Sequence, residues 1–156
     1  MKKRVFFLSV PLLFWLGCSG GSGKEPTAES FSQDFVGSYT DGSKLRNLLP
    51  TDAIIDEMIK CPGDNPLKKS IEEVKGKISK LKTPEGATIG YKASSVKEST
   101  SHKKGDKIGE CEVLTGFSMM KLEVGVEKRL GDKSQEEKME VEATTLNSKW
   151  YLINFK

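Results

Sequence analysis

The feature that most constrains how this chain can fold is a change in the spacing of its apolar residues near Ala87. Before this point they recur every three or four positions, which is the period of an amphipathic helix. After it they alternate with polar residues, as in strands with one buried and one solvated face. We therefore expect an α+β domain in which N-terminal helices pack on a curved antiparallel sheet.

The helical half predicts three short helices followed by a longer one. Thr27 is a suitable N-cap for the first helix, and Thr51 or Asp52 for the third. The longer helix is expected to begin after Asn65, its N-cap, with Pro66 in its first turn. Its apolar residues recur at spacings of 4, 3, 4 and 3 and form one face: Leu67, Ile71, Val74, Ile78 and Leu81.

From Ala87 onward, the alternation predicts about 4–5 hairpin-linked strands. The polar stretches 97–107 and 130–136 are interpreted as connections, and Asn147-Ser148 as a tight turn into the last strand. Acidic residues are expected only on the solvated positions of these strands. The candidate core of the sheet is its apolar face: Met120, Leu122, Val124, Val126, Met139, Val141, Ala143 and Trp150.

The first 17 residues have the form of a secretory signal. A positive cluster at residues 2–4 precedes an apolar run from Val5 to Leu16, which Pro11 interrupts. This run is shorter than the roughly 20 apolar residues that a membrane-spanning helix needs. A flexible linker rich in Gly and Ser is expected at residues 18–30, which leaves 31–156 as a single domain.

Gly17-Cys18, at the end of this signal, resembles a bacterial lipobox. The resemblance implies cleavage before Cys18 and acylation of Cys18, so that a lipid would anchor the chain to a membrane. Trp15 stands where the usual motif has Leu, and relaxed lipoboxes of this kind resemble those of spirochaetes more than those of enteric bacteria. Ser19 favours the outer membrane under the enterobacterial sorting rule. The alternative is an ordinary secretory signal in which Cys18 is incidental.

The order of elements in residues 27–156 is similar to that of small NTF2-like lipoproteins, in which helices pack into a curved sheet. An early aromatic helix and the final Lys-Trp-Tyr-Leu-Ile-Asn-Phe strand carry this resemblance. A cystatin-like arrangement of a helix on a sheet is the second possibility. Some NTF2-like proteins enclose a pocket, so the resemblance also implies a possible ligand site between helices and sheet.

The side-chain charge is balanced once the signal is removed. The chain has 25 Lys+Arg and 22 Asp+Glu, and three of the basic residues, Lys2, Lys3 and Arg4, lie in the signal. The remaining basic and acidic residues are equal in number and alternate along the chain. We therefore expect no nucleic-acid partner, because binding a polyphosphate backbone requires a concentrated positive surface.

Cys61 and Cys111 are the two cysteines that remain after Cys18 is assigned to the lipobox. An exported protein meets an oxidising compartment, so the pair predicts a disulfide. The alternative is a metal site, but it lacks further ligands, because the chain has a single histidine, His102, in a polar stretch. The disulfide is expected to tie the helical half to the sheet.

Neither a catalytic nor a cofactor-binding motif is present: Gly-x-Ser-x-Gly, His-Glu-x-x-His and Cys-x-x-Cys are all missing. Asp52, Asp56 and Glu57 are interpreted as acids that favour a helix start. Tyr91 and Tyr151 are interpreted as core. The sequence therefore predicts no catalytic residue, metal or cofactor.

Two function classes follow. The first is a non-enzymatic binding or structural module at the cell envelope or surface, whose partner is a protein. Surface lipoproteins of spirochaetes often bind host proteins such as a matrix component or plasminogen, so the resemblance extends to a host partner. The second is an enzyme or small-ligand carrier with a pocket between helices and sheet. The candidate partner contacts are the residues of the polar stretch: His102, Lys103, Lys104, Asp106 and Lys107.

Overall fold

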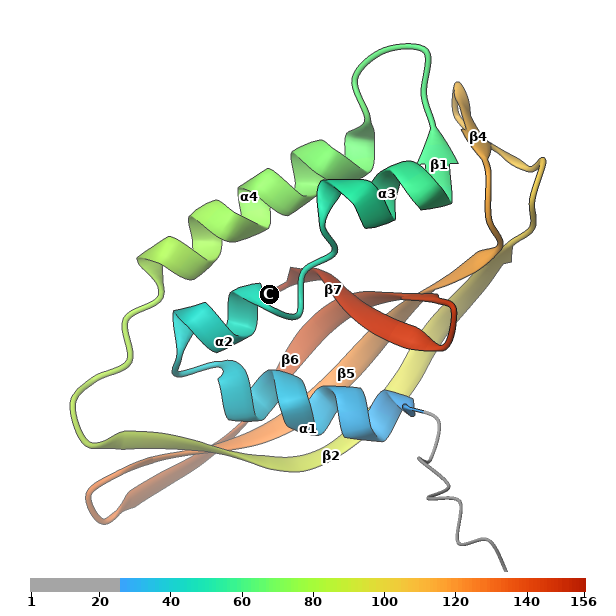
Figure 1. Ribbon diagram of the computed structural model, residues 1–156. Helices are drawn as coiled ribbons and strands as arrows, with labels where there is room; N and C mark the ends of the chain where they lie inside the picture. Colours follow the sequence, from blue (N-terminus) through green and yellow to red (C-terminus); the bar gives the residue numbers. More distant parts are fainter. Residues whose placement is uncertain (1–25) are drawn as a thin grey trace, which may run out of the picture.

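The computed structural model describes residues 26–156, which form helices and antiparallel sheets as the change of period predicts (Figure 1). Cys18, its lipobox and most of the expected linker lie outside the described residues. The helices are α1 (Ala28–Ser38), α2 (Gly42–Arg46), α3 (Asp52–Met58) and α4 (Pro66–Lys80). The strands are β1 (Ile59–Lys60), β2 (Ala87–His102), β3 (Lys107–Ile108), β4 (Cys111–Val113), β5 (Phe117–Leu130), β6 (Lys133–Leu146) and β7 (Lys149–Phe155).

The predicted N-caps are confirmed. The Thr27 hydroxyl accepts a hydrogen bond from the Ser30 backbone N–H, Thr51 does the same for Ile54, and Asn65 for Leu67. Each cap satisfies a backbone donor that a helix start leaves without an intrahelical partner. Helix α1 begins at Ala28, three residues before the expected domain start at 31, because Thr27 and Ser30 form a capping box.

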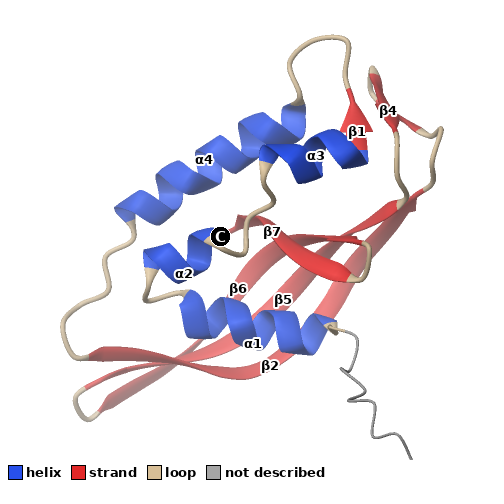
Figure 2. Cartoon of the chain, in the orientation of Figure 1, coloured by secondary structure: helices blue, strands red, loops and turns tan. Residues whose placement is uncertain are grey.

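The main sheet has the strand order β2-β5-β6-β7, and all its neighbours are antiparallel. A smaller sheet, β1-β4-β3, lies beside it. Figure 2 shows the helices on one side of the main sheet, and we call that side its inner face. The core lies between them and includes Phe35, Leu45, Ile55, Ile71, Val74, Leu122, Val124, Val141 and Leu152.

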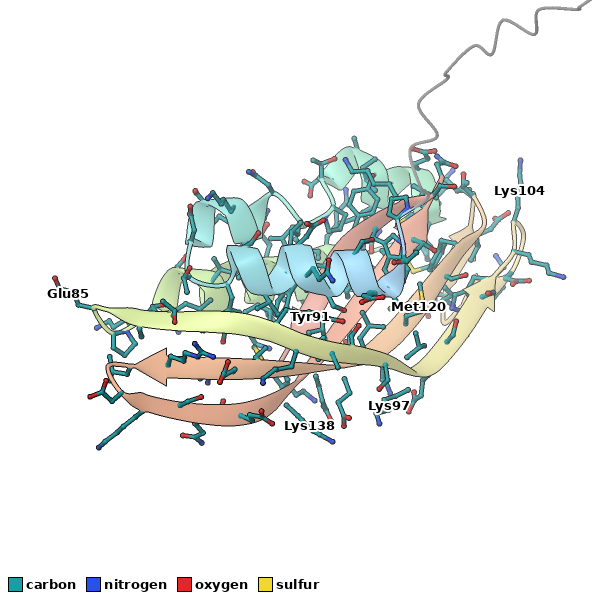
Figure 3. The ribbon with its side chains drawn as sticks, turned by 90° about the horizontal axis from the view of Figure 1, so that it is seen from below. Glu85, Tyr91, Lys97, Lys104, Met120 and Lys138 are labelled. Carbon is teal, nitrogen blue, oxygen red and sulfur yellow. A yellow bond between two sulfur atoms is a disulfide. The ribbon has the colours of Figure 1, made fainter. Side chains whose placement is uncertain are left out.

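Both polar stretches that we interpreted as connections belong largely to strands. Strand β2 continues through Lys97–His102, and only Lys103–Asp106 forms the loop; β6 already begins at Lys133. The interpretation was wrong because polar residues are stable in a strand when their side chains point to solvent and pair across it. Glu123 of β5 binds both Lys97 of β2 and Lys138 of β6, at 3.3 and 3.1 Å. In Figure 3, Lys97 and Lys138 point away from the helices.

Strand β2 forms one edge of the main sheet. Its pairing with β5 shifts register at Lys92 and again at Lys97, so two lysines occupy bulges on this edge. Bulges and lysines on an edge strand hinder pairing with a further strand from another chain. This edge is therefore poorly suited to take up a partner by strand addition.

Trp150 is only partly buried, in contrast to Val124, which is fully buried as predicted. The Trp150 ring stacks on Phe31 with 5.4 Å between ring centroids, and its indole N–H donates to the Pro26 carbonyl at 2.8 Å. These contacts hold the start of α1 against β7.

The structure joins Cys61 and Cys111 in the predicted disulfide. Cys61 directly follows β1, and Cys111 is the first residue of β4, the strand that pairs with β1. The bridge therefore reinforces the pairing of β1 with β4 within the smaller sheet, next to α3, and does not tie the helical half to the main sheet as expected. The difference arises because the chain forms this separate three-stranded sheet before β5 begins.

Candidate functional site

The main sheet is longer than the helices that cover it. Strands β5 and β6 have 14 residues each, which corresponds to about 48 Å of strand. Helix α1 has 11 residues and α4 has 15, or about 16 and 22 Å. Gly131, with a φ of 57°, makes the tight turn between β5 and β6, because glycine adopts positive φ without strain. The β5–β6 hairpin consequently extends past the helices at one end (lower left in Figure 1).

Cross-strand pairing shows which side chains share the inner face at this end, because residues directly opposite one another point to the same side of a sheet. From β2 across β5 to β6, the outermost rows are Ala87–Leu130–Lys133, Ile89–Lys128–Gln135 and Tyr91–Val126–Glu137. The inner face is thus apolar on β2, mixed on β5 and polar or charged on β6.

This uncovered end forms a cleft of about 910 Å³, which we call the end cleft. Three separate parts of the chain line it: the end of α1, the connection between α4 and β2, and the ends of the three strands. Tyr39 is the C-cap of α1 and Leu81 that of α4, and Pro84 follows in the connection. Together with Ile89 and Leu130 they give the cleft apolar walls from both the helix side and the sheet side.

Leu130 is the clearest sign that this end is not closed core. It is 51% exposed, and Val96 is the other large hydrophobic residue with comparable exposure within residues 26–156. Single exposed apolar residues are common on protein surfaces. Leu130 differs because it lines a cleft together with further apolar side chains, and such concave, mainly apolar surfaces with a few polar groups are typical of ligand sites.

The charged groups around the end cleft are mainly basic. Lys128 is paired with Glu137, and Arg129 with Glu127 at 2.8 Å. Two further lysines of the lining, Lys82 and Lys133, form no ion pair with any carboxylate in the described part of the chain. Asp132 is the acidic residue of the lining. The cleft therefore keeps a small positive excess after its ion pairs are formed.

Tyr39 places a phenol at the cleft wall near the Lys128–Glu137 pair. Burial raises the pKa of the Tyr39 phenol above its ordinary value; Lys128 acts in the opposite direction and Glu137 adds to the increase. The phenol therefore remains protonated at neutral pH and available as a hydrogen-bond donor.

Glu137 corrects our expectation that acidic residues lie only on solvated strand positions. It pairs with Val126, which is fully buried, so its side chain starts from the inner face. The expectation failed because we began the alternation of this strand at Met139, after the supposed connection, and so did not extend it back to position 137. Sequence reasoning missed three ionisable residues on the inner face: Lys128, Lys133 and Glu137. Continuing the alternation of Met139 and Val141 backward along β6 would have found Glu137.

The residues predicted to contact a partner lie at the opposite end of β2 from the end cleft. Lys104 is exposed at the tip of the loop, and Figure 3 shows it and Glu85 at opposite ends of the molecule. Asp106 is engaged within the loop, where its carboxylate accepts the Lys103 N–H at 2.7 Å. Lys107 lies 3.8 Å from Glu112.

His102, the remaining candidate contact, is partly buried against Phe117, with 5.0 Å between ring centroids. It ends β2 and lines a hollow of about 290 Å³ with Thr100 and Met119. The candidate contacts therefore share one end of the molecule without converging on one cleft.

The other acidic and aromatic candidates have local partners. Asp56 binds Lys68 at 2.7 Å, and Glu57 accepts a hydrogen bond from Asn147 at 3.0 Å. The Tyr91 hydroxyl lies 3.0 Å from the Ser94 hydroxyl. Burial raises the pKa of Tyr151, which lies in the core. Asp52 lies in the first turn of α3 as predicted, but Asp56 and Glu57 do not act at a helix start, because α3 ends at Met58 and they lie in its last turn. Tyr91 is half-buried against the core and Tyr151 is buried in it, in agreement with their predicted structural roles.

Within residues 26–156, no group of three or more His, Cys, Asp or Glu side chains is arranged to hold a metal ion. None of the helices in the same part of the chain combines the length and apolarity that crossing a bilayer requires. In comparisons with known proteins, no family model, curated protein or solved structure matches the chain.

Proposed function

We propose that this chain is a lipoprotein, anchored to a bacterial membrane through Cys18, that acts as a non-enzymatic binding module of the cell envelope or surface. The end cleft is its binding site. The observation that carries this proposal is the apolar lining of the cleft from two sides, by Leu81 and Pro84 and by Ile89 and Leu130, with unpaired lysines beside it.

The position of the cleft relative to the start of the domain supports this arrangement. The chain enters the domain at Pro26, which Trp150 holds at the first turn of α1. Tyr39, at the far end of the same helix, lines the cleft. An anchor attached before residue 26 would therefore join the domain at the opposite end of α1 from the cleft, and this leaves the cleft accessible to a ligand.

The finer fold assignment is part of the proposal. Several helices on the inner face of a twisted sheet, with a cleft between helix ends and sheet, favour an NTF2-like fold (Figure 2). A cystatin-like fold, with a single helix on the sheet, fits the four helices less well. Carrying a small ligand is the alternative within this framework, and the same cleft supports it.

Two experiments test the anchor. The intact mass of the protein extracted from membranes should show loss of residues 1–17 and gain of acyl chains. Cys18→Ala should abolish the acyl mass. An unmodified thiol on the mature wild-type protein would contradict the proposal.

Photo-crosslinking of the full chain in cells tests the binding site. A photoreactive phenylalanine analogue is placed at Leu130 in the cleft, at Lys104 in the loop or at Lys97 on the outer face; all three positions are exposed. We expect a saturable adduct at position 130 and none at 97. Adducts only at position 104 would show that the partner binds the loop and not the end cleft. Adducts at none of the three positions would contradict a binding role.

A further inference from the structure

The polarity of the end cleft changes in one direction across the sheet. On its inner face β2 contributes Ala87 and Ile89, β5 contributes Leu130 and Lys128, and β6 contributes Lys133 and Gln135. A ligand that fits this surface needs an apolar part over β2 and a polar part over β6. A molecule with one apolar part and one polar part is an amphiphile.

The charge of the polar side specifies which kind of amphiphile fits. Lys133 is on the polar side, at the end of the hairpin, and Lys82 lies on the connection after α4; both are exposed and neither is paired within residues 26–156. Asp132 reduces their excess without removing it. An anionic head group gains charge-assisted hydrogen bonds from the lysines, whereas a cationic one meets like charge.

We infer that the end cleft binds an anionic amphiphile, with its acyl chain between the Leu81–Pro84 wall and the Ile89–Leu130 wall and its head group at Lys133 and Lys82. This inference rests on the proposed function, because it names the ligand of the same cleft. The size of the cleft agrees with it: about 910 Å³ is within the range of pockets that take small organic ligands.

The two smaller hollows and the β2 edge offer weaker support for a ligand site. The hollow beside His102 has about 290 Å³, and its lining includes Lys121, which Glu98 already binds at 2.7 Å. In the hollow near Asp56 and Lys68, these two residues are already paired with each other. The β2 edge has lysines at both of its bulges.

The test uses the chain from residue 18 onward with Cys18→Ser, so that its own acyl group does not compete. A fluorescent dansyl-labelled fatty acid is the probe. Laurate, lauryl alcohol and lauryl trimethylammonium, which share one chain length, are the competitors. We expect laurate to displace the probe about tenfold more strongly than the alcohol, since one charge-assisted hydrogen bond corresponds to about this factor. The ammonium compound should be weakest.

Matched variants locate the site. Leu130→Ser, which removes apolar contact with the acyl chain, and Lys133→Gln, which removes a charge-assisted hydrogen bond to the head group, should each weaken laurate binding by about tenfold. Val96→Ser and Lys104→Gln are the controls, because Val96 and Leu130 have similar exposure, 47% and 51%, and Lys104 is exposed far from the cleft. The controls should bind as the wild type does. Circular dichroism confirms that each variant is folded.

Three results would overturn the inference. Equal displacement by laurate and lauryl alcohol would show that the cleft does not prefer an anionic head group. Unchanged binding in Leu130→Ser would show that laurate does not bind in the end cleft. Failure of every amphiphile to bind, with crosslinks at position 130 retained, would reject the ligand class and leave the cleft as a binding site for another partner. Loss of both the amphiphile and the crosslinks would reject the proposed function as well.

Discussion

Leu122 and Leu130 lie on the same face of the same strand, yet their environments are opposite. Leu122 is 1% exposed beneath the helices, and Leu130 is 51% exposed at the open end of the sheet. Eight positions along β5 separate a core residue from a cleft residue. The difference lies not in residue type or alternation but in how far the covering helices extend.

The comparison shows that the sheet has two parts. Where α1 and α4 cover it, apolar inner-face residues form a continuous core. Beyond the helix ends the same alternation continues, but its apolar side chains face a cleft, and ionisable residues such as Lys128 and Glu137 appear among them. The open part is where a ligand can replace the missing helix surface.

The largest expected effect on stability comes from truncating Leu122, and comparison with the same change at Leu130 tests the difference between the two positions. Leu122→Ala should lower the free energy of unfolding by about 2–5 kcal/mol, because it removes buried methyl groups and leaves a cavity. Leu130→Ala should change it by less than about 0.5 kcal/mol, as for other exposed positions. Urea unfolding followed by circular dichroism measures both. Equal losses would mean that the open end is part of the core.

Removal of the disulfide tests whether the domain can be destabilised at a distance from the end cleft without a change in binding there. Replacing Cys61 and Cys111 together by Ser should lower the free energy of unfolding by about 2–4 kcal/mol, because the unfolded chain gains freedom. Thermal unfolding under non-reducing conditions provides the comparison with the wild type. Ligand or partner binding at the cleft should be unchanged, and a parallel loss of binding would show that the two ends are coupled.

Local signals predicted much of the fold. The caps Thr27, Thr51 and Asn65 were identified correctly because a helix start depends on neighbours within a few residues. The disulfide followed from a simple count of cysteines in a chain that the first 17 residues lead us to expect to be exported. The polar extension of β2 was missed because its stability depends on pairing with β5, which a pattern within β2 alone does not show.

The end cleft could not be predicted from the sequence for a related reason. Its lining comes from residues between Tyr39 and Gln135, and it exists because the strands are longer than the helices packed on them. In the sequence, Leu81 has the spacing of a core residue, and nothing local distinguishes it from Ile78. Only the relative placement of α4, β2 and the β5–β6 hairpin separates the two roles.

A smaller effect is expected where the chain enters the domain. Trp150→Phe retains an aromatic ring against Phe31 but removes the hydrogen bond to Pro26. We expect a loss of about 0.5–1.5 kcal/mol in the free energy of unfolding, which is the usual contribution of one hydrogen bond. Amide hydrogen exchange should increase in the first turn of α1 and not at Tyr39. An increase along the whole helix would show that α1 depends on this bond throughout.

The smallest effect concerns the outer face, where Glu123 bridges β2 and β6. Hydrogen bonds from Lys138 and then Lys97 hold the pKa of Glu123 below its ordinary value. A lowered folded-state pKa means that the stabilisation is present above the unfolded-state pKa, about 4.3, and is lost as the pH falls through the folded-state value. Thermal unfolding of Glu123→Gln should therefore depend less on pH below about pH 4.3 than that of the wild type. Identical pH profiles would mean that solvent screens both pairs.

Nuclear magnetic resonance tests the central claim most directly, because it reports on both ends of the molecule in one titration. Laurate is added to the isotopically labelled chain that starts at residue 18 and carries Cys18→Ser, and the backbone amide shifts are followed. We predict saturable changes within residues 81–89 and 128–135, which line the end cleft, and none in the loop at residues 103–106. Changes confined to that loop, or none within 81–89 and 128–135 at saturating laurate, would contradict the account.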